Sequence, residues 1–150
     1  FDGAGFFVTT DFEVARDRLS LSEIRHERIR ALELDWRDHA AMNWASRSSP
    51  PLRPTLYEKK ALPEQLRDQM QEWVDDPDRG VRVEDGTILF NPIFDWQARD
   101  FDFWSAGQDL CELTSFYASD PLKQKLEAAS KQGCPHDFFE FDWSLNVAKH

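Results

Sequence analysis

The sequence predicts an α+β fold, in which about four helices pack on a mixed, mostly antiparallel sheet. Two observations predict this class. Apolar residues recur at helical spacing in some stretches and alternate with polar residues in others, and an Asp-Gly pair between two apolar runs is typical of a hairpin turn. The chain has 150 residues, which is enough for a hydrophobic core, so we expect a single domain over residues 1–150.

The first three elements are expected to be a strand, a helix and a second strand. Residues 5–10 are rich in aromatic and β-branched side chains, which favours a strand. Ser20 and Glu23 have the spacing of a capping box, which predicts a helix over residues 20–31. Residues 39–45 are mostly small or apolar and predict a buried strand, which must end before the Pro-Pro pair because proline has no N–H for a sheet.

A second helix and a hairpin are expected next. The helix is indicated by apolar residues at positions i, i+4, i+8, i+11 and i+12, which are Leu62, Leu66, Met70, Trp73 and Val74. Asp85 and Gly86 have the chemistry of a two-residue turn, because both central positions of such a turn require a positive φ. They predict a hairpin over residues 81–90.

Two more helices and a strand are expected to complete the fold. A cap at Ser105 predicts a third helix, and a fourth is expected to run from about Asp120 to Gly133. Aromatic residues between positions 95 and 109 are expected to anchor a loop to the core. Apolar and polar side chains alternate over residues 139–146, which predicts a closing strand.

Composition narrows the classes of partner. A formal net charge of −10 and a pI near 4.8 disfavour a nucleic acid, whose phosphates require a basic patch. The longest apolar runs are too short for membrane insertion, and the first residues lack the pattern of a signal peptide. We therefore expect a soluble chain that binds a protein or a small molecule, and export after removal of a signal peptide stays open.

The sequence predicts neither a metal nor a cofactor. Cys111 and Cys134 are the two cysteines of the chain, so it can form at most one disulfide and lacks the thiols of a structural zinc cluster. Three histidines lie near carboxylates in the sequence, but their spacing does not support a metal site. These are His26, His39 and His136.

The strongest candidate site lies between His39 and Ser49. In a strand, His39 and Asn43 would share a face with only alanine between them, and Ser46 and Ser48 follow closely. A hydroxyl beside a neutral imidazole can be activated as a nucleophile, with Asn43 as the orienting or oxyanion-binding group. A structural interpretation is more common for such residues, because buried histidines bond carbonyl groups and serines before prolines bond their own turns.

The polar face of the closing strand is a second candidate. It carries Asp142, Ser144 and Asn146. If this strand neighbours the segment of His39, Asp142 would orient the imidazole and fix its tautomer. The alternative is an edge strand whose polar face is simply solvated.

The third candidate is the pair His26 and Arg30 on the predicted first helix. Both lie within about one turn of Glu23 or Glu27. The structural alternative is a set of surface pairs, each worth a few tenths of a kcal/mol.

Five ordered motifs resemble those of the family called domain of unknown function 547. The motifs lie at residues 19–30, 39–52, 80–83, 93–96 and 141–146. The first is similar to the family pattern S-L-x-x-I-E-H-x-x-L-R, and the second to H-F-A-L-x-C-A-S-x-S-C-P-P-L. The last resembles the closing Y-D-W-S-L-N. The resemblance spans about residues 6–146, which is nearly the whole chain.

The resemblance implies a site built around a histidine and two cysteines, with thiol chemistry of the papain or transglutaminase kind. The matching positions are His26, Arg30, His39, Ala45, Ser46, Ser48, Pro50, Pro51, Leu52, Asp142, Trp143, Ser144, Leu145 and Asn146. This chain departs from the family at both cysteines, where it has Trp44 and Ser49, and at the first motif's glutamate, where it has Arg25. Family members also carry an upstream helical segment, so we expect residues 1–150 to be the later part of a longer family domain.

Three hypotheses follow for the function. The first, slightly favoured, is a degenerate, non-catalytic module that binds a protein or small ligand, because both cysteine positions are lost while His39 is retained. Its expected binding residues are His26, Arg30, Asn43, Ser46, Ser48, Ser144 and Asn146. The second is a hydrolase or acyl transferase with His39, Ser49 or Ser46, and Asp142 in a Ser-His-Asp arrangement, although a serine hydroxyl ionises far less readily than a thiol. The third is a structural part of a larger protein.

Overall fold

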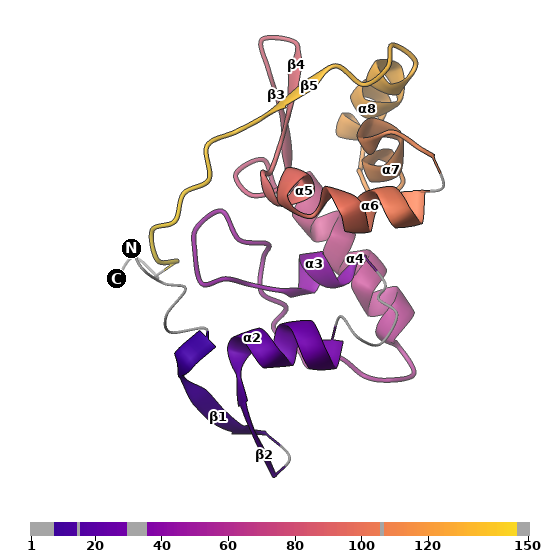
Figure 1. The fold of residues 1–150 in the computed structure, drawn as a ribbon. Coiled ribbons are helices and arrows are strands. Elements are labelled where there is room, and N and C mark those ends of the chain that lie inside the picture. The colour runs from indigo at the N-terminus through magenta and orange to yellow at the C-terminus, as the bar shows by residue number, and fades with distance from the viewer. Residues whose placement is uncertain (1–7, 15, 30–35, 106, 147–150) are drawn as a thin grey trace. The chain divides into compact units, whose positions relative to one another are not determined.

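A computed structural model gives the structure of the chain, and it describes residues 8–14, 16–29, 36–105 and 107–146 (Figure 1). Contacts divide the chain into two compact units, Phe1–Asp35 and Trp36–His150. We describe each unit by itself. The expectation of a single domain over residues 1–150 stays a prediction.

The first unit contains a short antiparallel hairpin. Its strands are β1, Asp11–Val14, and β2, Asp17–Ser20. The strand predicted over residues 5–10 is wrong where the structure describes it, because residues 8–9 are helical, and residues 5–7 lie outside the described residues. The sheet begins later because the polar-apolar alternation from Asp11 onward suits a solvent-facing hairpin better than the aromatic run before it.

The predicted capping box at Ser20 is confirmed. The Glu23 N–H donates to Ser20 Oγ at 3.2 Å, and the Ser20 N–H donates to Glu23 Oε2 at 2.7 Å. The box begins helix α2, Leu21–Glu23, which continues as a π-helix, η1, over Ile24–Ile29. The predicted helix therefore starts where expected, and its end near residue 31 lies outside the described residues.

In the second unit, helix α4 is confirmed over Leu62–Asp75, with a proline in its first turn. Its buried residues include the predicted apolar face of Leu66, Met70, Trp73 and Val74. Gly80 follows the helix and packs directly on it, since a Cβ built at this position would lie 1.7 Å from the Trp73 carbonyl oxygen. Only glycine permits this approach, which places the next strand against α4.

The predicted hairpin is confirmed and forms part of a three-stranded mixed sheet. Strand β3, Val81–Glu84, is antiparallel to β4, Thr87–Phe90, and β5, His136–Phe138, is parallel to β4 (Figure 1). Asp85 and Gly86 make the turn with φ of 48° and 82°. The helices and the mixed sheet together make an α+β fold, as the sequence predicts.

The closing strand over residues 139–146 is wrong in position, because β5 ends at Phe138. After the Phe139 N–H donates to the Phe90 carbonyl, the chain leaves the sheet and continues as an extended segment. Phe139 and Phe141 are buried, but Trp143 is 61% exposed. The alternation of apolar and polar residues therefore predicts the burial of Phe139 and Phe141 correctly. It fails for Trp143, because the chain has left the sheet and no sheet face covers this side chain.

The buried strand predicted over residues 39–45 is also wrong. Helix α3 spans Asp38–Ala41, and Ala45 has φ of 59°, which a strand does not allow. Ala40 and Ala41 favour a helix, and the short turn of helix buries His39 against neighbouring elements. His39 and Asn43 therefore do not share a strand face.

The stretch after the hairpin is more helical than predicted. Helices α5, Ile93–Trp96, and α6, Ala98–Ser105, replace the expected loop, and Ser105 ends α6 instead of capping the next helix. The cap of α7, Leu110–Ser115, is Asp109, which accepts the Glu112 N–H at 2.8 Å. Helix α8, Leu122–Ser130, follows as predicted, with Gly133 at φ of 81° after its end.

The core of the second unit lies where its helices meet the sheet. Helix α3 packs on α4, α4 on β3, and α7 on α8 (Figure 1). Trp73 stacks on Phe94 with ring centres 4.6 Å apart, and Phe94 contacts Phe101 at 4.9 Å. Among the described residues, no helix combines the length and the apolar character needed to cross a membrane.

Candidate functional site

Two segments far apart in the sequence, residues 45–48 and 142–146, run side by side in opposite directions. The Asn146 N–H donates to the Ala45 carbonyl at 2.8 Å, and the Arg47 N–H donates to the Ser144 carbonyl at 2.9 Å. The Asp142 N–H donates to Ser48 Oγ at 2.9 Å. The Asp142 segment therefore lies beside the serine-rich segment that follows His39, and the contact is made by loops and not by two strands. We call these residues the paired segments.

The hydroxyl of Ser49 is fully enclosed in the turn that begins this region. Ser49 Oγ accepts the N–H groups of Trp44 at 3.0 Å and Ser46 at 3.3 Å, and it lies 2.8 Å from Ser46 Oγ. A serine oxygen can accept two hydrogen bonds, and the two N–H groups use both of these positions. The Ser49 hydroxyl can then donate its own proton to Ser46 Oγ. In this arrangement three hydrogen bonds hold the Ser49 hydroxyl within the turn.

His39 has a different carboxylate partner from the one predicted. Its Nε2 lies 3.0 Å from Asp100 Oδ2 on α6 and 3.8 Å from Asp38 Oδ1, and the ring packs against Phe101. The imidazole is 2% exposed. Within the described part of the chain, no hydrogen bond joins His39 to Ser49, so the structure does not bring the two groups together as a base and a nucleophile.

Asp100 was not predicted as a partner of His39. The sequence places it among several aspartates of an expected loop, whereas the structure has it in the first turn of helix α6. The clustered acidic residues favoured a loop, and no pattern within this segment indicates a contact with His39.

Asn43 closes the same turn as Ser49. Its Nδ2 donates to the Pro50 carbonyl at 2.7 Å, and its Oδ1 accepts the Ala45 N–H at 2.7 Å. The amide thus holds the backbone of residues 43–50 through both of its polar atoms. The predicted binding residues His26 and Arg30 cannot be placed in a site, because the His26 side chain and all of Arg30 lie outside the described residues.

Asp142 is exposed and has a lowered pKa. The carboxylate accepts the Ser144 N–H at 2.8 Å. Hydrogen bonds from the hydroxyl and the backbone of Ser144 lower the Asp142 pKa, and they outweigh the opposing effect of desolvation; the positive charge of Arg47 lowers the pKa by the smallest amount. Asp142 is therefore a carboxylate at neutral pH.

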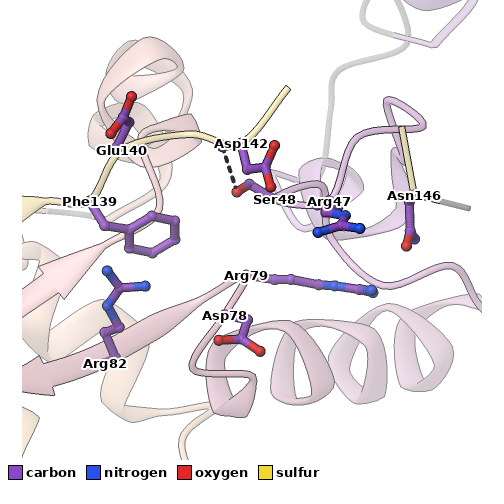
Figure 2. Close-up of a pocket in the computed structure, with 9 residues that line it drawn as sticks. All are labelled: Arg47, Ser48, Asp78, Arg79, Arg82, Phe139, Glu140, Asp142 and Asn146. Atoms are coloured by element: carbon purple, nitrogen blue, oxygen red, sulfur yellow. Dashed lines mark hydrogen bonds between the residues drawn. The ribbon is translucent and has the colours of Figure 1, made fainter. Parts of the chain in front are cut away.

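Beside the paired segments lies a cleft of about 440 Å³, which we call the arginine cleft (Figure 2). It is lined by Arg47, Ser48, Asp78, Arg79, Arg82, Phe139, Glu140, Asp142 and Asn146. Its three guanidinium groups come from a loop, from the turn before β3 and from β3 itself. Figure 2 shows Arg79 extended along the cleft toward Arg47, while Arg82 lies under the ring of Phe139.

The arginines of the cleft differ in their existing contacts. Arg82 lies 2.7 Å from Glu84 through its Nε, and its guanidinium carbon lies 4.6 Å from the centre of the Phe139 ring. Arg79 has a longer contact, 3.6 Å from its Nε to Asp76 Oδ2. Arg47 is exposed. Arg47 and Arg79 are therefore less committed to protein partners than Arg82.

The buried amide of Asn91 connects the two walls of the cleft. Its Nδ2 donates to the Ser48 carbonyl at 2.8 Å and also to the Arg79 carbonyl, and its Oδ1 accepts the Ile93 N–H at 2.9 Å. No sequence pattern indicates this role. Arg79 and Arg82 were missed as well, because an arginine in a turn or on a short hairpin strand is commonly no more than a solvated side chain.

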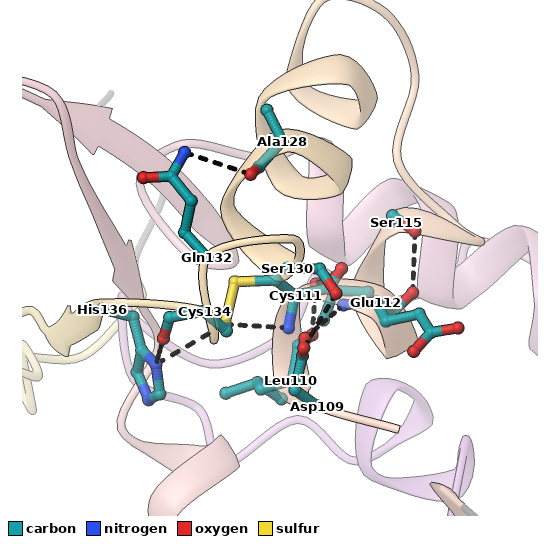
Figure 3. Close-up of a disulfide and its surroundings, with 11 residues drawn as sticks. Asp109, Leu110, Cys111, Glu112, Ser115, Ala128, Ser130, Gln132, Cys134 and His136 are labelled. Atoms are coloured by element: carbon teal, nitrogen blue, oxygen red, sulfur yellow. Dashed lines mark hydrogen bonds between the residues drawn. A yellow bond between two sulfur atoms is a disulfide. The ribbon is translucent and has the colours of Figure 1, made fainter. Parts of the chain in front are cut away.

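The two cysteines form a disulfide that joins α7 to the turn after α8 (Figure 3). Among the described residues, the group that could hold a metal ion is Asp109 with these two cysteines. A disulfide removes both thiolates, which are the ligands that such a site would need. These residues therefore offer no metal site while the disulfide is intact.

Comparisons of this chain with protein-family models, with curated proteins and with solved structures found no match.

Proposed function

We propose that the chain is a non-catalytic binding domain that holds the anionic group of a small ligand between Arg47 and Arg79. We further propose that it is a degenerate relative of the domain of unknown function 547 family, in which the two cysteine positions have lost their chemistry. The observation that carries this proposal is the pairing of Arg47 and Arg79 across one cleft of a chain with a net charge of −10.

The proposal of a non-catalytic domain is supported by the partners of the expected catalytic groups. The Ser49 hydroxyl is occupied by two backbone N–H groups and by Ser46, and the His39 imidazole is buried beside Asp100. Nucleophilic catalysis requires a hydroxyl within hydrogen-bond reach of its base. The known partners of Ser49 and His39 are consistent with structural roles for both.

The proposal of an anionic ligand is supported by the chemistry of guanidinium groups. A guanidinium group presents several N–H donors in a planar fork, which matches a carboxylate or phosphate group. Asn146 lines the same cleft and adds an amide. The carboxylates of Asp78, Glu140 and Asp142 also line it, so an extended polyanion is disfavoured and a small ligand with one anionic group fits best.

The test is calorimetric titration of the chain with inorganic phosphate. We expect saturable binding that weakens about tenfold in Arg79→Ala and in Arg47→Ala, since the loss of one charge-assisted hydrogen bond is worth about 1.5–3 kcal/mol. Arg67→Ala is the matched control, because Arg67 is an exposed arginine of α4 outside the cleft. The proposal fails if the wild-type chain shows no saturable binding, or if all three variants bind equally.

A hydrolase assay tests the enzyme hypothesis directly. We expect p-nitrophenyl acetate to be hydrolysed at the same rate by the wild-type chain and by His39→Ala. Turnover by the wild type that disappears in this variant, together with loss in Ser49→Ala, would replace the binding proposal by a Ser-His mechanism.

We also propose that the chain works in an oxidising compartment, which it would reach by export. The support is the disulfide between Cys111 and Cys134, because the reducing systems of the cytosol keep cysteine thiols in their reduced form. The test is the mass of the chain isolated from its native cells after alkylation. Two alkylated cysteines without prior reduction would contradict this proposal.

A further inference from the structure

A group of aromatic rings adjoins the arginine cleft and is partly exposed. The indole rings of Trp44, Trp96 and Trp143 come from three separate segments and lie nearly parallel. The angles between their planes are 11°, 13° and 23°, and their centres are 5.5–6.1 Å apart. Phe141 lies 4.5 Å from Trp143. Trp143 is 61% and Trp96 is 43% exposed, so the group presents aromatic surface to solvent.

Two carboxylates accompany the aromatic rings. A hollow of about 420 Å³ is lined by Glu140, Phe141, Asp142 and Trp143. We call it the aromatic hollow. Asp142 is ionised at neutral pH because the hydrogen bonds from Ser144 lower its pKa. Aromatic faces and carboxylates both attract cations, so the hollow has the chemistry of a site for an organic cation.

The aromatic hollow and the arginine cleft share a wall. Glu140 and Asp142 line both of them, so the two openings lie next to each other. Of the residues that line only one of the two, Arg47 and Arg79 belong to the arginine cleft and Trp143 belongs to the aromatic hollow. A ligand long enough to cross the wall would meet guanidinium groups at one end and an aromatic ring with carboxylates at the other.

We infer that the ligand of this site is a zwitterion, which carries a phosphate group joined by a short linker to a quaternary ammonium group. The phosphate half rests on the proposed function, with Arg47 and Arg79 as its partners. The ammonium half binds in the aromatic hollow, against Trp143 and between the charges of Glu140 and Asp142. A quaternary ammonium suits the hollow better than a primary one, because it is bulky, weakly hydrated and favoured by indole faces.

Calorimetric titration with three probes tests this inference. The probes are inorganic phosphate, choline and phosphocholine. We expect phosphocholine to bind about tenfold more tightly than inorganic phosphate, and choline alone to bind more weakly than phosphocholine. Trp143→Ala should remove the advantage of phosphocholine and leave the affinity for phosphate unchanged. Phe116→Ala is the matched control, since Phe116 is also 61% exposed but lies outside the hollow.

The outcomes separate this inference from the proposed function. If phosphate binds but phosphocholine binds no more tightly, or if Trp143→Ala keeps the full advantage, the zwitterion inference is overturned and the anion site stands. If neither phosphate nor phosphocholine binds, the proposed function fails as well.

A second arm identifies the source of the ligand. If the wild-type chain floats with phosphatidylcholine vesicles and Trp143→Ala does not, the site binds the same chemical group as part of a lipid headgroup. Binding of free phosphocholine without flotation would support a soluble ligand.

Discussion

At the scale of single residues, the hydroxyl of Ser49 organises a turn. It accepts the N–H groups of Trp44 and Ser46, which both belong to the loop that leads into the Pro-Pro pair. An N–H group that loses its acceptor inside a protein costs about 1–3 kcal/mol, whereas an exposed one is satisfied by water. The stabilising role of Ser49 therefore depends on its burial.

Ser49→Ala should lower the free energy of unfolding by about 2–3 kcal/mol, because the N–H groups of Trp44 and Ser46 lose a buried acceptor. Urea denaturation followed by circular dichroism measures this change. Ser119→Ala is the control, since the hydroxyl of Ser119 accepts one hydrogen bond in an exposed position and its removal should cost less than about 0.5 kcal/mol. Equal stability of the two variants would show that the Ser49 network does not form.

Ser144 should control the titration of Asp142. The pKa of Asp142 lies below the ordinary aspartate value of 3.8, mainly because Ser144 donates hydrogen bonds to the carboxylate. A lowered folded-state pKa means that the carboxylate stabilises the native chain above pH 3.8 and that this contribution is lost as pH falls through the folded-state pKa.

In Ser144→Ala the Asp142 pKa should therefore move upward, toward its ordinary value. Carboxyl-detected NMR titration of Asp142 measures the shift. Ser130→Ala, at a hydroxyl that bonds Asp109, is the control and should leave Asp142 unchanged. An identical titration midpoint in the wild type and in Ser144→Ala would contradict the assignment.

At the scale of elements, the arginine cleft depends on the junction between β4 and α5. Asn91 lies at this junction, is completely buried, and bonds the carbonyl groups of Ser48 and Arg79. Both of these residues line the cleft, and Asn91 itself does not. The amide thus holds two lining segments together from outside the cleft.

Asn91→Ala should destabilise the chain by about 2–3 kcal/mol and weaken the binding of phosphate, because buried carbonyl groups lose a donor and the cleft walls lose their link. Thermal unfolding and calorimetric titration measure the two effects. The control is Thr87→Ala, a change at an exposed position at the start of β4. It should lower the free energy of unfolding by less than about 1 kcal/mol and leave phosphate binding intact. If Asn91→Ala bound phosphate as tightly as the wild type, the positioning role would be ruled out.

The elements that the sequence predicts well are those that carry local signals. The α4 face, the Asp85-Gly86 turn and the capping box at Ser20 each need only a few neighbouring residues to be recognised. Helix α3 and the segment after Phe138 depend on what packs against them, and no local pattern reports that. Ala40 and Ala41 favour a helix, but residues 39–45 are too few to form a stable helix on their own, so tertiary contacts decide their structure.

The candidate site follows the same division. The sequence offered Asp142 as a partner of His39, whereas in the structure the Asp142 N–H bonds Ser48 and the imidazole of His39 lies beside Asp100. It did not indicate Arg79 or Asn91, whose roles arise from a glycine-mediated approach of β3 to α4 and from a buried junction. Such roles require knowledge of contacts between segments, which a pattern in one segment does not contain.

At the scale of the whole molecule, one covalent bond holds the α7 and α8 region together. The disulfide closes a loop between Cys111 and Cys134, which are 23 positions apart in the sequence. Both residues are buried, and α7 packs on α8 beside them. The disulfide lowers the conformational entropy of the unfolded chain by closing this loop. Without the bond, the unfolded chain would regain that entropy and the folded state would be less stable.

Cys111→Ala combined with Cys134→Ala should lower the free energy of unfolding by about 3 kcal/mol, which is the loop-closure contribution expected for a loop of this size. Guanidinium denaturation of the double variant, of the wild type and of the wild type with reductant provides the measurement. The variant and the reduced wild type should unfold at similar denaturant concentrations, well below the oxidised chain. Coincident midpoints for all three samples would contradict the expectation.

The paired segments also have a consequence for biosynthesis. Residues 45–48 leave the ribosome long before residues 142–146, yet each supplies half of the hydrogen bonds that form one wall of the cleft. A nascent chain can complete α4 and the hairpin from local contacts, but it cannot close this wall until nearly a hundred further residues have been translated. This wall of the cleft is therefore among the last parts of the described chain to form, together with the core contacts of Phe141.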